Sequence, residues 1–450
     1  MKTNIKTDLL NGPIWKQILI FFFPIMLGTF FQQLYNTVDA IVVGNFIGKA
    51  ALGAVGGSTG TLINLLINFI SGLAGGATVV IAQSYGKKDV EGIKNGIRSG
   101  MFLGVVLGFV LMIVGIALTR KMLVAMAVTS DILPYAVTYM RIYLLGLVPT
   151  MIYNVGSGVL RAVGDSKRPL YFLIVSCIVN IILDIFLVCF VHMEVEGAAI
   201  ATIVSQFISC FLVLMALGKK GSIYYYSLKD DFGFDESSLK RIVIIGLPTG
   251  IQSVLYSISN LLINAEVNSY GTDTIAAFTA FGKIDALFWM ISGAYSVSLI
   301  TIVGQCFGAG KIDRLKKAVW TAILMYCITS GLIIGVCYFG GDFLYRLFTS
   351  DASVISIGME MLKFLCPFWI TFCFVEIFSS TIRACGESIK PMIITALGIC
   401  GFRMLWIMFY PSKTVIDTLW CYPISWIITS AIFLVYYLRG SWLKGTKSTI

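Results

Sequence analysis

Leu160-Arg-Ala-Val-Gly-Asp-Ser-Lys-Arg-Pro169 and Ile382-Arg-Ala-Cys-Gly-Glu-Ser-Ile-Lys-Pro391 are two versions of the same short sequence. They lie 222 residues apart, and the same offset aligns Gln83-Ser-Tyr-Gly86 with Gln305-Cys-Phe-Gly308. Two unrelated motifs that recur at one offset indicate an internal repeat that covers about half of the chain. The fold should therefore consist of two similar halves.

Composition places both halves in a lipid bilayer. The chain has 450 residues, of which 58% are hydrophobic and only 12% are charged, and its mean hydropathy is +0.89. Apolar runs of about 20 residues or more recur along it, and each is long enough to cross a hydrocarbon core of about 30 Å as a helix. The runs are continuous rather than alternating, which excludes a β-barrel. We expect an all-α polytopic membrane protein.

The apolar runs predict twelve transmembrane helices. In the first half, the spans are expected near residues 14–41, 51–82, 99–119, 132–159, 170–191 and 197–217. In the second half, they are expected near residues 242–265, 277–304, 318–340, 353–380, 391–410 and 418–438.

The net charge of +10 follows the predicted topology. Lysine and arginine gather in the loops that lie on the same side as the N-terminus, as the positive-inside rule requires of the cytoplasmic side. The basic excess is therefore a topology signal, and no nucleic-acid partner is expected. We predict a multi-pass protein of the plasma membrane with both termini in the cytoplasm.

An even number of crossings in each half gives the repeat a parallel orientation. The second half must enter the membrane from the same side as the first, so a pseudo-two-fold axis along the membrane normal relates them. We expect an N-lobe of helices 1 to 6 at residues 14–217, a cytoplasmic linker at 218–240 and a C-lobe of helices 7 to 12 at 241–439. Two such lobes suit transport by alternating access, with a cavity between them.

Ionisable groups inside the spans are costly, and those of the N-lobe predict a cation site. Asn180 and Asp184 are four residues apart, so they lie on one face of helix 5. From the helical rise, Asp39 on helix 1 and Thr202 on helix 6 should reach the same outer half of the lobe. Two carboxylates in a low-dielectric pocket require a bound Na⁺ or a proton. The four residues are thus the candidates for ion coupling, and no other cofactor is expected.

Other polar residues in the spans are candidates for different roles. Pro24 lies inside helix 1, where it removes a backbone hydrogen bond and permits a kink. Asn154 aligns with Glu376 in the repeat, which suggests a position facing the central cavity. Together with Glu266 and Asp285, these residues could attract a cationic substrate.

The paired Gln-x-x-Gly loops, the paired Arg-Ala-x-Gly-Asp/Glu-Ser loops and the six-plus-six plan resemble the multidrug and toxic compound extrusion (MATE) transporters. The resemblance implies a V-shaped cavity and export of cationic or amphipathic drugs and metabolites in exchange for inward Na⁺ or H⁺. Its DinF-like subgroup carries an aspartate in helix 1, an Asn-x-x-x-Asp pair in helix 5 and a threonine in helix 6, here Asp39, Asn180, Asp184 and Thr202. In the same subgroup, Tyr35 and Pro24 stand at matching places in helix 1, and we expect these two residues to form a helix 1 hinge.

Three alternatives remain open at this point. A flippase of a lipid-linked precursor is the nearest, although it would need several basic residues in its cavity. A major facilitator protein would carry a Gly-x-x-x-Asp-Arg-x-Gly-Arg loop, which residues 83–98 lack. A membrane enzyme would need clustered histidines or an Asp-rich metal loop, and the chain has one histidine. We therefore expect a transporter, not an enzyme, that acts as a monomer on small organic cations in contact with membrane lipid.

Overall fold

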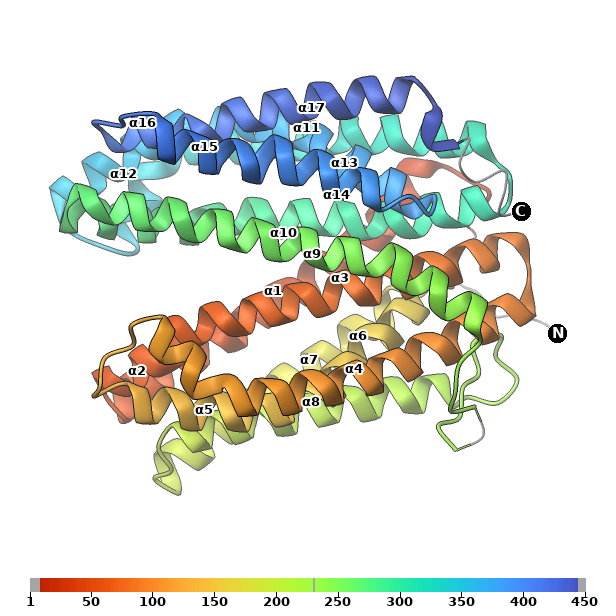
Figure 1. Cartoon of the computed structure of the whole chain (residues 1–450), viewed down its shortest axis with the longest axis horizontal. Helices are drawn as coiled ribbons and strands as arrows, with labels where there is room; N and C mark the ends of the chain where they lie inside the picture. Colours follow the sequence, from red (N-terminus) through yellow and green to blue (C-terminus); the bar gives the residue numbers. More distant parts are fainter. Residues whose placement is uncertain (1–8, 230, 444–450) are drawn as a thin grey trace. The chain divides into compact units, whose positions relative to one another are not determined.

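The computed structural model describes residues 9–229 and 231–443, which form helices joined by short loops, with no β-strand among them (Figure 1). The helices are α1 (Ile14–Phe46), α2 (Lys49–Gly56), α3 (Ser58–Lys87), α4 (Val90–Ala125), α5 (Leu133–Leu145), α6 (Leu147–Ala162), α7 (Lys167–Asp184), the π-helix η1 (Ile185–Phe190), α8 (Val195–Leu217), α9 (Glu236–Val267), the 3-10 helix η2 (Asn268–Tyr270), α10 (Thr272–Gly308), α11 (Ile312–Arg346), α12 (Ala352–Leu365), the 3-10 helix η3 (Cys366–Phe368), α13 (Trp369–Ala384), α14 (Ile389–Thr395), the π-helix η4 (Ala396–Gly401), α15 (Phe402–Phe409), α16 (Val415–Leu419), α17 (Cys421–Leu438) and the 3-10 helix η5 (Ser441–Leu443).

Among the described residues, eleven helical stretches are long and apolar enough to cross a membrane. A twelfth span arises when α5 and α6 are taken together as one crossing that bends by 47°. The bend falls at Gly146, and Pro149 in the first turn of α6 has no N–H to continue the hydrogen bonding of α5. The prediction of an all-α fold with twelve spans is confirmed, with this one span broken.

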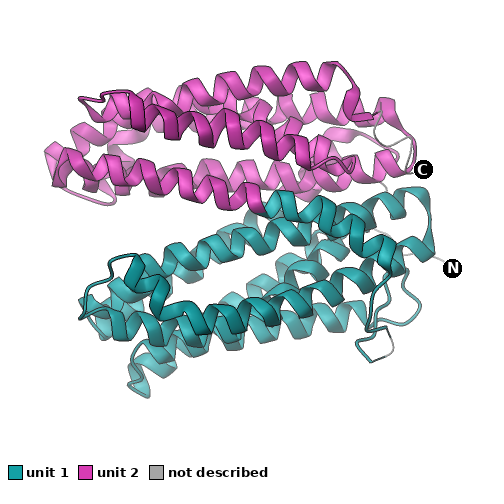
Figure 2. Ribbon diagram, in the orientation of Figure 1, with its two compact units in different colours: residues 1–8, 23–250 teal, residues 9–22, 251–450 magenta. Residues whose placement is uncertain are grey.

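The chain packs as two compact units (Figure 2). Residues 23–250 belong to the first unit, and residues 9–22 and 251–450 to the second. The expected lobes, 14–217 and 241–439, follow the repeat, whereas the packing divides the chain elsewhere. Helix α1 changes unit between Phe22 and Phe23, and α9 changes unit after Gly250. The first turns of α1 therefore pack with the second unit, and the rest of α1 packs with the first. In α9 the order is reversed, because the part up to Gly250 packs with the first unit and the rest with the second.

Hydrogen bonds from α11 and the loop before it fix the start of the chain within the second unit. Arg314 donates from Nε to the carbonyl of Leu9 at 3.1 Å, and from Nη2 to the side-chain oxygen of Gln17 at 2.7 Å and the carbonyl of Gly12 at 3.0 Å. The Nζ of Lys311 donates to the carbonyl of Leu10 at 3.0 Å. These bonds explain why the first turns of α1 belong to the second unit.

Within the first unit, glycines bring α3 and the start of α9 into close contact. A Cβ atom on Gly72 would lie 2.6 Å from the backbone nitrogen of Gly250, and one on Gly76 would lie 2.5 Å from the carbonyl oxygen of Ile242. On the facing helix, a Cβ on Gly246 would lie 2.6 Å from a carbonyl oxygen of α3. Glycines spaced four apart on both helices allow this approach, as in the Gly-x-x-x-Gly pairs of membrane helices.

The repeated Arg-Ala-x-Gly-Asp/Glu-Ser sequence forms a turn between two helices in each unit. Its glycines, Gly164 and Gly386, have φ angles of +102° and +98°, which side chains with a Cβ rarely adopt. After the first turn, the carboxylate of Asp165 accepts hydrogen bonds from the backbone N–H groups of Lys167 and Arg168 at the start of α7. The motif that revealed the repeat is therefore explained by backbone geometry.

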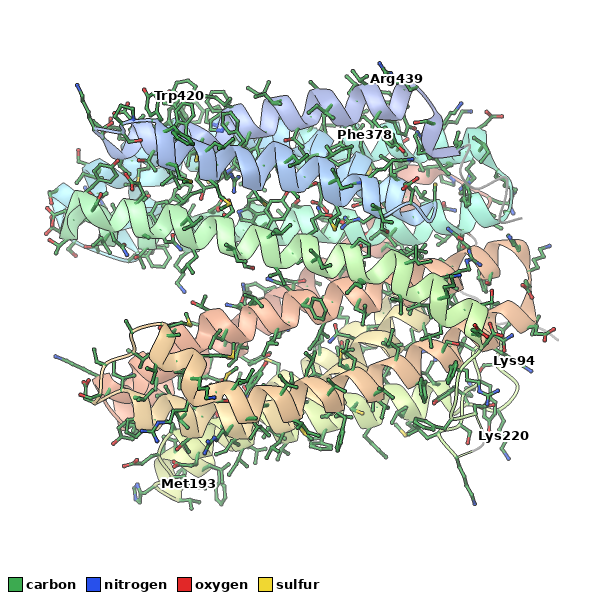
Figure 3. All side chains as sticks on the ribbon, viewed as in Figure 1. Lys94, Met193, Lys220, Phe378, Trp420 and Arg439 are labelled. Atoms are coloured by element: carbon green, nitrogen blue, oxygen red, sulfur yellow. The ribbon has the colours of Figure 1, made fainter. Side chains whose placement is uncertain are left out.

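The labelled side chains in Figure 3 locate the two ends of each unit. In the first unit, Lys94 and Lys220 lie at the end opposite Met193. In the second unit, Arg439 lies at the end opposite Trp420.

Candidate functional site

The four residues predicted to bind a cation come together in the first unit. Asp39 lies on α1, Asn180 and Asp184 on α7, and Thr202 on α8, and all are at most 3% exposed. The hydroxyl of Thr202 donates to Oδ2 of Asp39 at 3.4 Å and also to the carbonyl of Ala198 at 3.0 Å. Asp184 and Asn180 face the same carboxyl group closely enough to interact with it, although neither makes a hydrogen bond of good geometry.

The polar atoms of this cluster are largely without partners. Oδ1 of Asp39, both carboxylate oxygens of Asp184 and both amide atoms of Asn180 are buried and form no hydrogen bond. Two ionised carboxylates are acceptors only, so Asp39 and Asp184 repel each other until one binds a proton or both share a cation. The candidate ligand atoms are oxygens of carboxylates, an amide and a hydroxyl, which suit a hard cation such as Na⁺.

The local backbone explains how α7 presents its two polar groups. Asn180 and Asp184 are one turn apart, and α7 ends at Asp184, where the π-helix η1 begins. A π-helical segment widens the turn and frequently lies at functional sites. The change of helix type therefore coincides with the acidic residue of the site.

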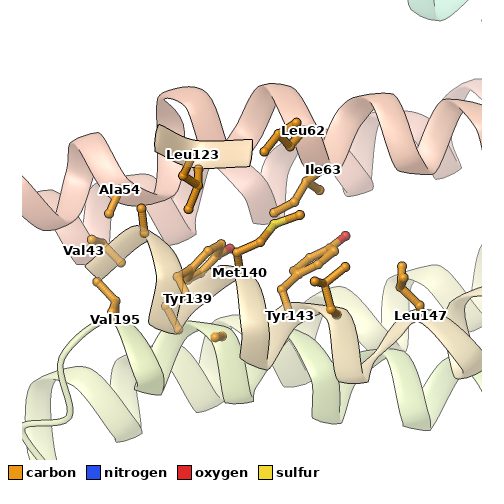
Figure 4. Packing of buried hydrophobic residues seen from close by; sticks show 14 of the residues in the cluster. Val43, Ala54, Leu62, Ile63, Leu123, Tyr139, Met140, Tyr143, Leu147 and Val195 are labelled. Atoms are coloured by element: carbon orange, nitrogen blue, oxygen red, sulfur yellow. The ribbon is translucent and has the colours of Figure 1, made fainter. Parts of the chain in front are cut away.

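Two tyrosines that sequence reasoning missed line the same site. Tyr139 and Tyr143 of α5 are buried, their ring centroids are 6.3 Å apart, and both interact electrostatically with Asp39 (Figure 4). Figure 4 shows them among apolar side chains that include Met140 and Leu147. The four-residue spacing of the two tyrosines on one helix face was the available signal.

The two helix 1 residues take different positions. Tyr35 lies one turn before Asp39 and interacts electrostatically with it, as well as with Tyr143. It therefore joins the acidic cluster, which gives it a second possible task besides the predicted hinge. Pro24 lies inside the continuous helix α1, immediately after the point where α1 changes unit. The hinge role of both residues stays a prediction.

The residues predicted for a substrate cavity have separate surroundings. Asn154 donates to the carbonyl of Thr150 at 2.8 Å within its own helix. Oε1 of Glu376 is 3.7 Å from Nη2 of Arg383 and accepts from Ser380 at 3.4 Å. No hydrogen bond or ion pair within the described residues joins Glu376 to Asp285 or Glu266.

The other two acids are held by aromatic residues. Oδ2 of Asp285 accepts from the indole Nε1 of Trp289 at 2.6 Å. Oε1 of Glu266 accepts from the hydroxyl of Tyr270 at 3.4 Å. A common cavity for Asn154, Glu266, Asp285 and Glu376 thus remains a prediction.

The profile of the MatE family matches residues 24–186 and 248–408. The chain belongs to the MatE family. The two matched segments begin at Pro24 and Pro248, so the family sequence itself occurs once in each half of the chain. Membership makes this MatE protein a membrane transporter.

Curated relatives match this MatE protein over almost its whole length. It is similar to the probable multidrug resistance protein YpnP of Bacillus subtilis (strain 168), 27% identical with 97% of each chain covered. It is also similar to the probable multidrug resistance protein NorM of Thermotoga maritima, at 26% identity with 96% and 94% covered. The FAD transporter of Shewanella oneidensis is 23% identical, with 98% of each chain covered.

Solved structures agree with the fold of this MatE protein. A crystal structure of MATE in the bent conformation aligns over 100% of both chains with a TM-score of 0.89 at 24% identity. A crystal structure of MATE in the straight conformation aligns over 99% of this chain and 100% of that one, with a TM-score of 0.89 at 25% identity. The chain therefore has the fold of these MATE structures.

Proposed function

We propose that this MatE protein is a secondary active antiporter that exports cationic or amphipathic drugs and metabolites in exchange for inward H⁺ or Na⁺. The relatives named as multidrug resistance proteins support the substrate class. The observation that carries the coupling is the buried Asp39–Asp184 pair, whose unpartnered oxygens require a positive charge. The protein acts as a monomer in the plasma membrane, with both termini in the cytoplasm and no cofactor besides the coupling ion.

The chemistry of the pair accounts for the exchange. Without a cation, the two neighbouring carboxylates repel each other in a buried site, which raises the free energy of that state. A proton or Na⁺ removes the repulsion and so stabilises a different arrangement of α1 against α7 and α8. The ion can shift the equilibrium only by its difference in affinity for the two arrangements. Each inward charge contributes about 2.3 kcal/mol per 100 mV of membrane potential.

The test is transport by the purified protein in liposomes. Ethidium movement is followed under an imposed Na⁺ gradient and, separately, under an imposed pH gradient. Asp184→Asn removes the carboxylate while keeping its volume, and Asp342→Asn serves as the matched control because Asp342 is exposed and pairs only with Arg346.

Transport that follows one gradient, is lost in Asp184→Asn and survives in Asp342→Asn supports antiport and identifies the ion. Transport that survives Asp184→Asn would move the coupling to another acid, with Glu376 examined next. If ethidium does not move under either gradient, the second candidate, a flippase of a lipid-linked precursor, is tested with a fluorescent lipid diphosphate. The observation that favours this candidate is the presence of two arginines, Arg383 and Arg403, in the interior of the second unit.

A further inference from the structure

Arg403 is a buried cation that the coupling mechanism does not use. It lies in the first turn of α15, directly after the π-helix η4, and is 1% exposed. Its Nη1 donates to Oδ1 of Asn260 on α9 at 3.2 Å. Its guanidinium carbon lies 4.1 Å from the ring centroid of Tyr422 and 5.9 Å from that of Trp426, both on α17. A charge inside a membrane span at this depth of burial is costly, so it indicates a task.

The other edge of the guanidinium has no partner. Nε and Nη2 are buried and form no hydrogen bond, and no carboxylate in the described chain lies within ion-pair distance of Arg403. Asp285 interacts with Arg403 only at longer range, because the indole of Trp289 holds its carboxylate. Nε and Nη2 present two parallel N–H groups, which match the two oxygens of a carboxylate.

The contacts of Arg403 leave the N–H groups of this edge unpaired and fix their direction. A ring stacked against the guanidinium covers its face, while donors continue to point outward in the plane. Asn260 occupies the Nη1 side. The edge formed by Nε and Nη2 is thus held in one orientation by contacts that do not consume its donors.

The repeat gives this site a counterpart in the first unit. At the offset of 222, Asn180 aligns with Phe402, the residue directly before Arg403. Helices α9, α15 and α17 of the second unit correspond to α1, α7 and α8 of the first. The same three-helix arrangement therefore holds carboxylates with free oxygens in one unit and a guanidinium with free N–H groups in the other.

We propose that the Nε–Nη2 edge of Arg403 binds the carboxylate group of transported compounds. The site deepens the proposed export function, on which it rests, since it gives the carboxylate of a transported compound a specific partner in the second unit. The π-helix η4 next to it supplies a stretch of backbone whose hydrogen bonding can rearrange to admit the ligand.

Two dyes that differ in a single group test the proposal. Rhodamine 110 has a free carboxylate, and rhodamine 123 is its methyl ester. Binding of each to the detergent-purified protein is measured by fluorescence polarisation, which needs no ion gradient, so a failure of the antiport proposal is separable from a failure of this one. We expect the wild type to bind rhodamine 110 about tenfold more tightly than rhodamine 123.

Arg403→Met should bring the ratio of the two affinities to about one, and Arg403→Lys should leave an intermediate ratio because an ammonium lacks the fork. Arg346→Met, which removes an exposed arginine of the same unit, should keep the wild-type ratio. A wild type without preference, or an Arg403→Met variant with the wild-type ratio, would overturn the proposal. A full wild-type ratio in Arg403→Lys would overturn the bidentate geometry, and this variant decides the matter if Arg403→Met does not purify as one species.

Discussion

The hydroxyl of Thr202 reaches Oδ2 of Asp39 at 3.4 Å although 163 residues separate them in the chain. The bond joins α8 to α1, and Asp184 on α7 faces the same carboxyl group. Three helices of one unit thus meet at a single acidic side chain. A change in the charge of Asp39 is therefore felt by three helices at once, which suits a group that links ion binding to a change of shape.

Thr202→Val should weaken binding of the coupling ion. Valine keeps the shape of threonine but removes the hydroxyl oxygen, and a hydrogen bond to a charged group is worth about 1.5–3 kcal/mol. The ion concentration for half-maximal ethidium transport should rise about tenfold, as measured in proteoliposomes at a series of ion concentrations. Thr321→Val is the matched control, because the Thr321 hydroxyl is exposed and donates to a carbonyl of its own helix. Equal ion dependence in the two variants would show that Thr202 is no ligand.

Gly76→Ala should destabilise the first unit. The added Cβ would lie 2.5 Å from the carbonyl oxygen of Ile242, so α3 and α9 must separate, and overpacking of this kind costs about 1–3 kcal/mol. Thermal unfolding in detergent measures the effect. Gly75→Ala controls for the glycine-to-alanine change itself, since its Cβ would meet no atom within 4 Å. The prediction fails if the neighbouring variants unfold at the same temperature.

Arg314→Lys should loosen the attachment of residues 9–17 to α11. Arg314 donates to Leu9, Gly12 and Gln17, and the ammonium group of a lysine cannot form all three hydrogen bonds in the same geometry. Faster hydrogen exchange of the amides in residues 14–22 is expected, by about tenfold, as read by mass spectrometry. Arg346→Lys, in an exposed i,i+4 pair with Asp342, should leave these amides unchanged. Unchanged exchange in Arg314→Lys would mean that the hydrogen bonds of Arg314 are not needed to hold this segment.

The linker end of α9 should be sensitive to acid. Asp235, outside the predicted membrane spans, accepts a hydrogen bond from the backbone N–H of Ser238 at 2.8 Å, which lowers the pKa of its carboxyl group. Because the folded-state pKa lies below the unfolded one, the stabilisation is present above pH about 4 and is lost as the pH falls through the folded value. The wild type should exceed Asp235→Ala in melting temperature at pH 6, with the gap narrowing by pH 3. A gap that stays constant over this range would contradict the assignment.

Helical geometry made the acidic cluster predictable. Asn180 and Asp184 share a face because of their spacing, and the rise per residue places Asp39 and Thr202 at a similar level. Hydropathy in turn predicts the spans, and the positions of the repeat predict two equivalent halves. These properties depend on local sequence, so they need no knowledge of which helices touch.

Features that depend on which helices pack together could not be predicted from the sequence. The tyrosines Tyr139 and Tyr143 join the cluster only because α5 lies beside α1. The site around Arg403 likewise depends on other helices, since Tyr422 comes from α17 and Asn260 from α9. The π-helices η1 and η4 leave no mark in hydropathy, since a single extra residue in a turn changes neither length nor polarity. The packing of residues 9–22 with the second unit likewise leaves no signal in the sequence of an apolar helix.

The packing of residues 9–22 with the second unit sets an order of events during biosynthesis. Leu10 leaves the ribosome early, but its hydrogen-bond donor, Lys311, follows 301 residues later. At about 5–20 residues per second, the interval is roughly 15–60 s. The first helix is therefore made long before its first turns can pack against α11, and the packing of α1 cannot be completed until much of the second half has been made. Expression of either half alone would leave the opening turns of a helix without the surface they evolved to cover.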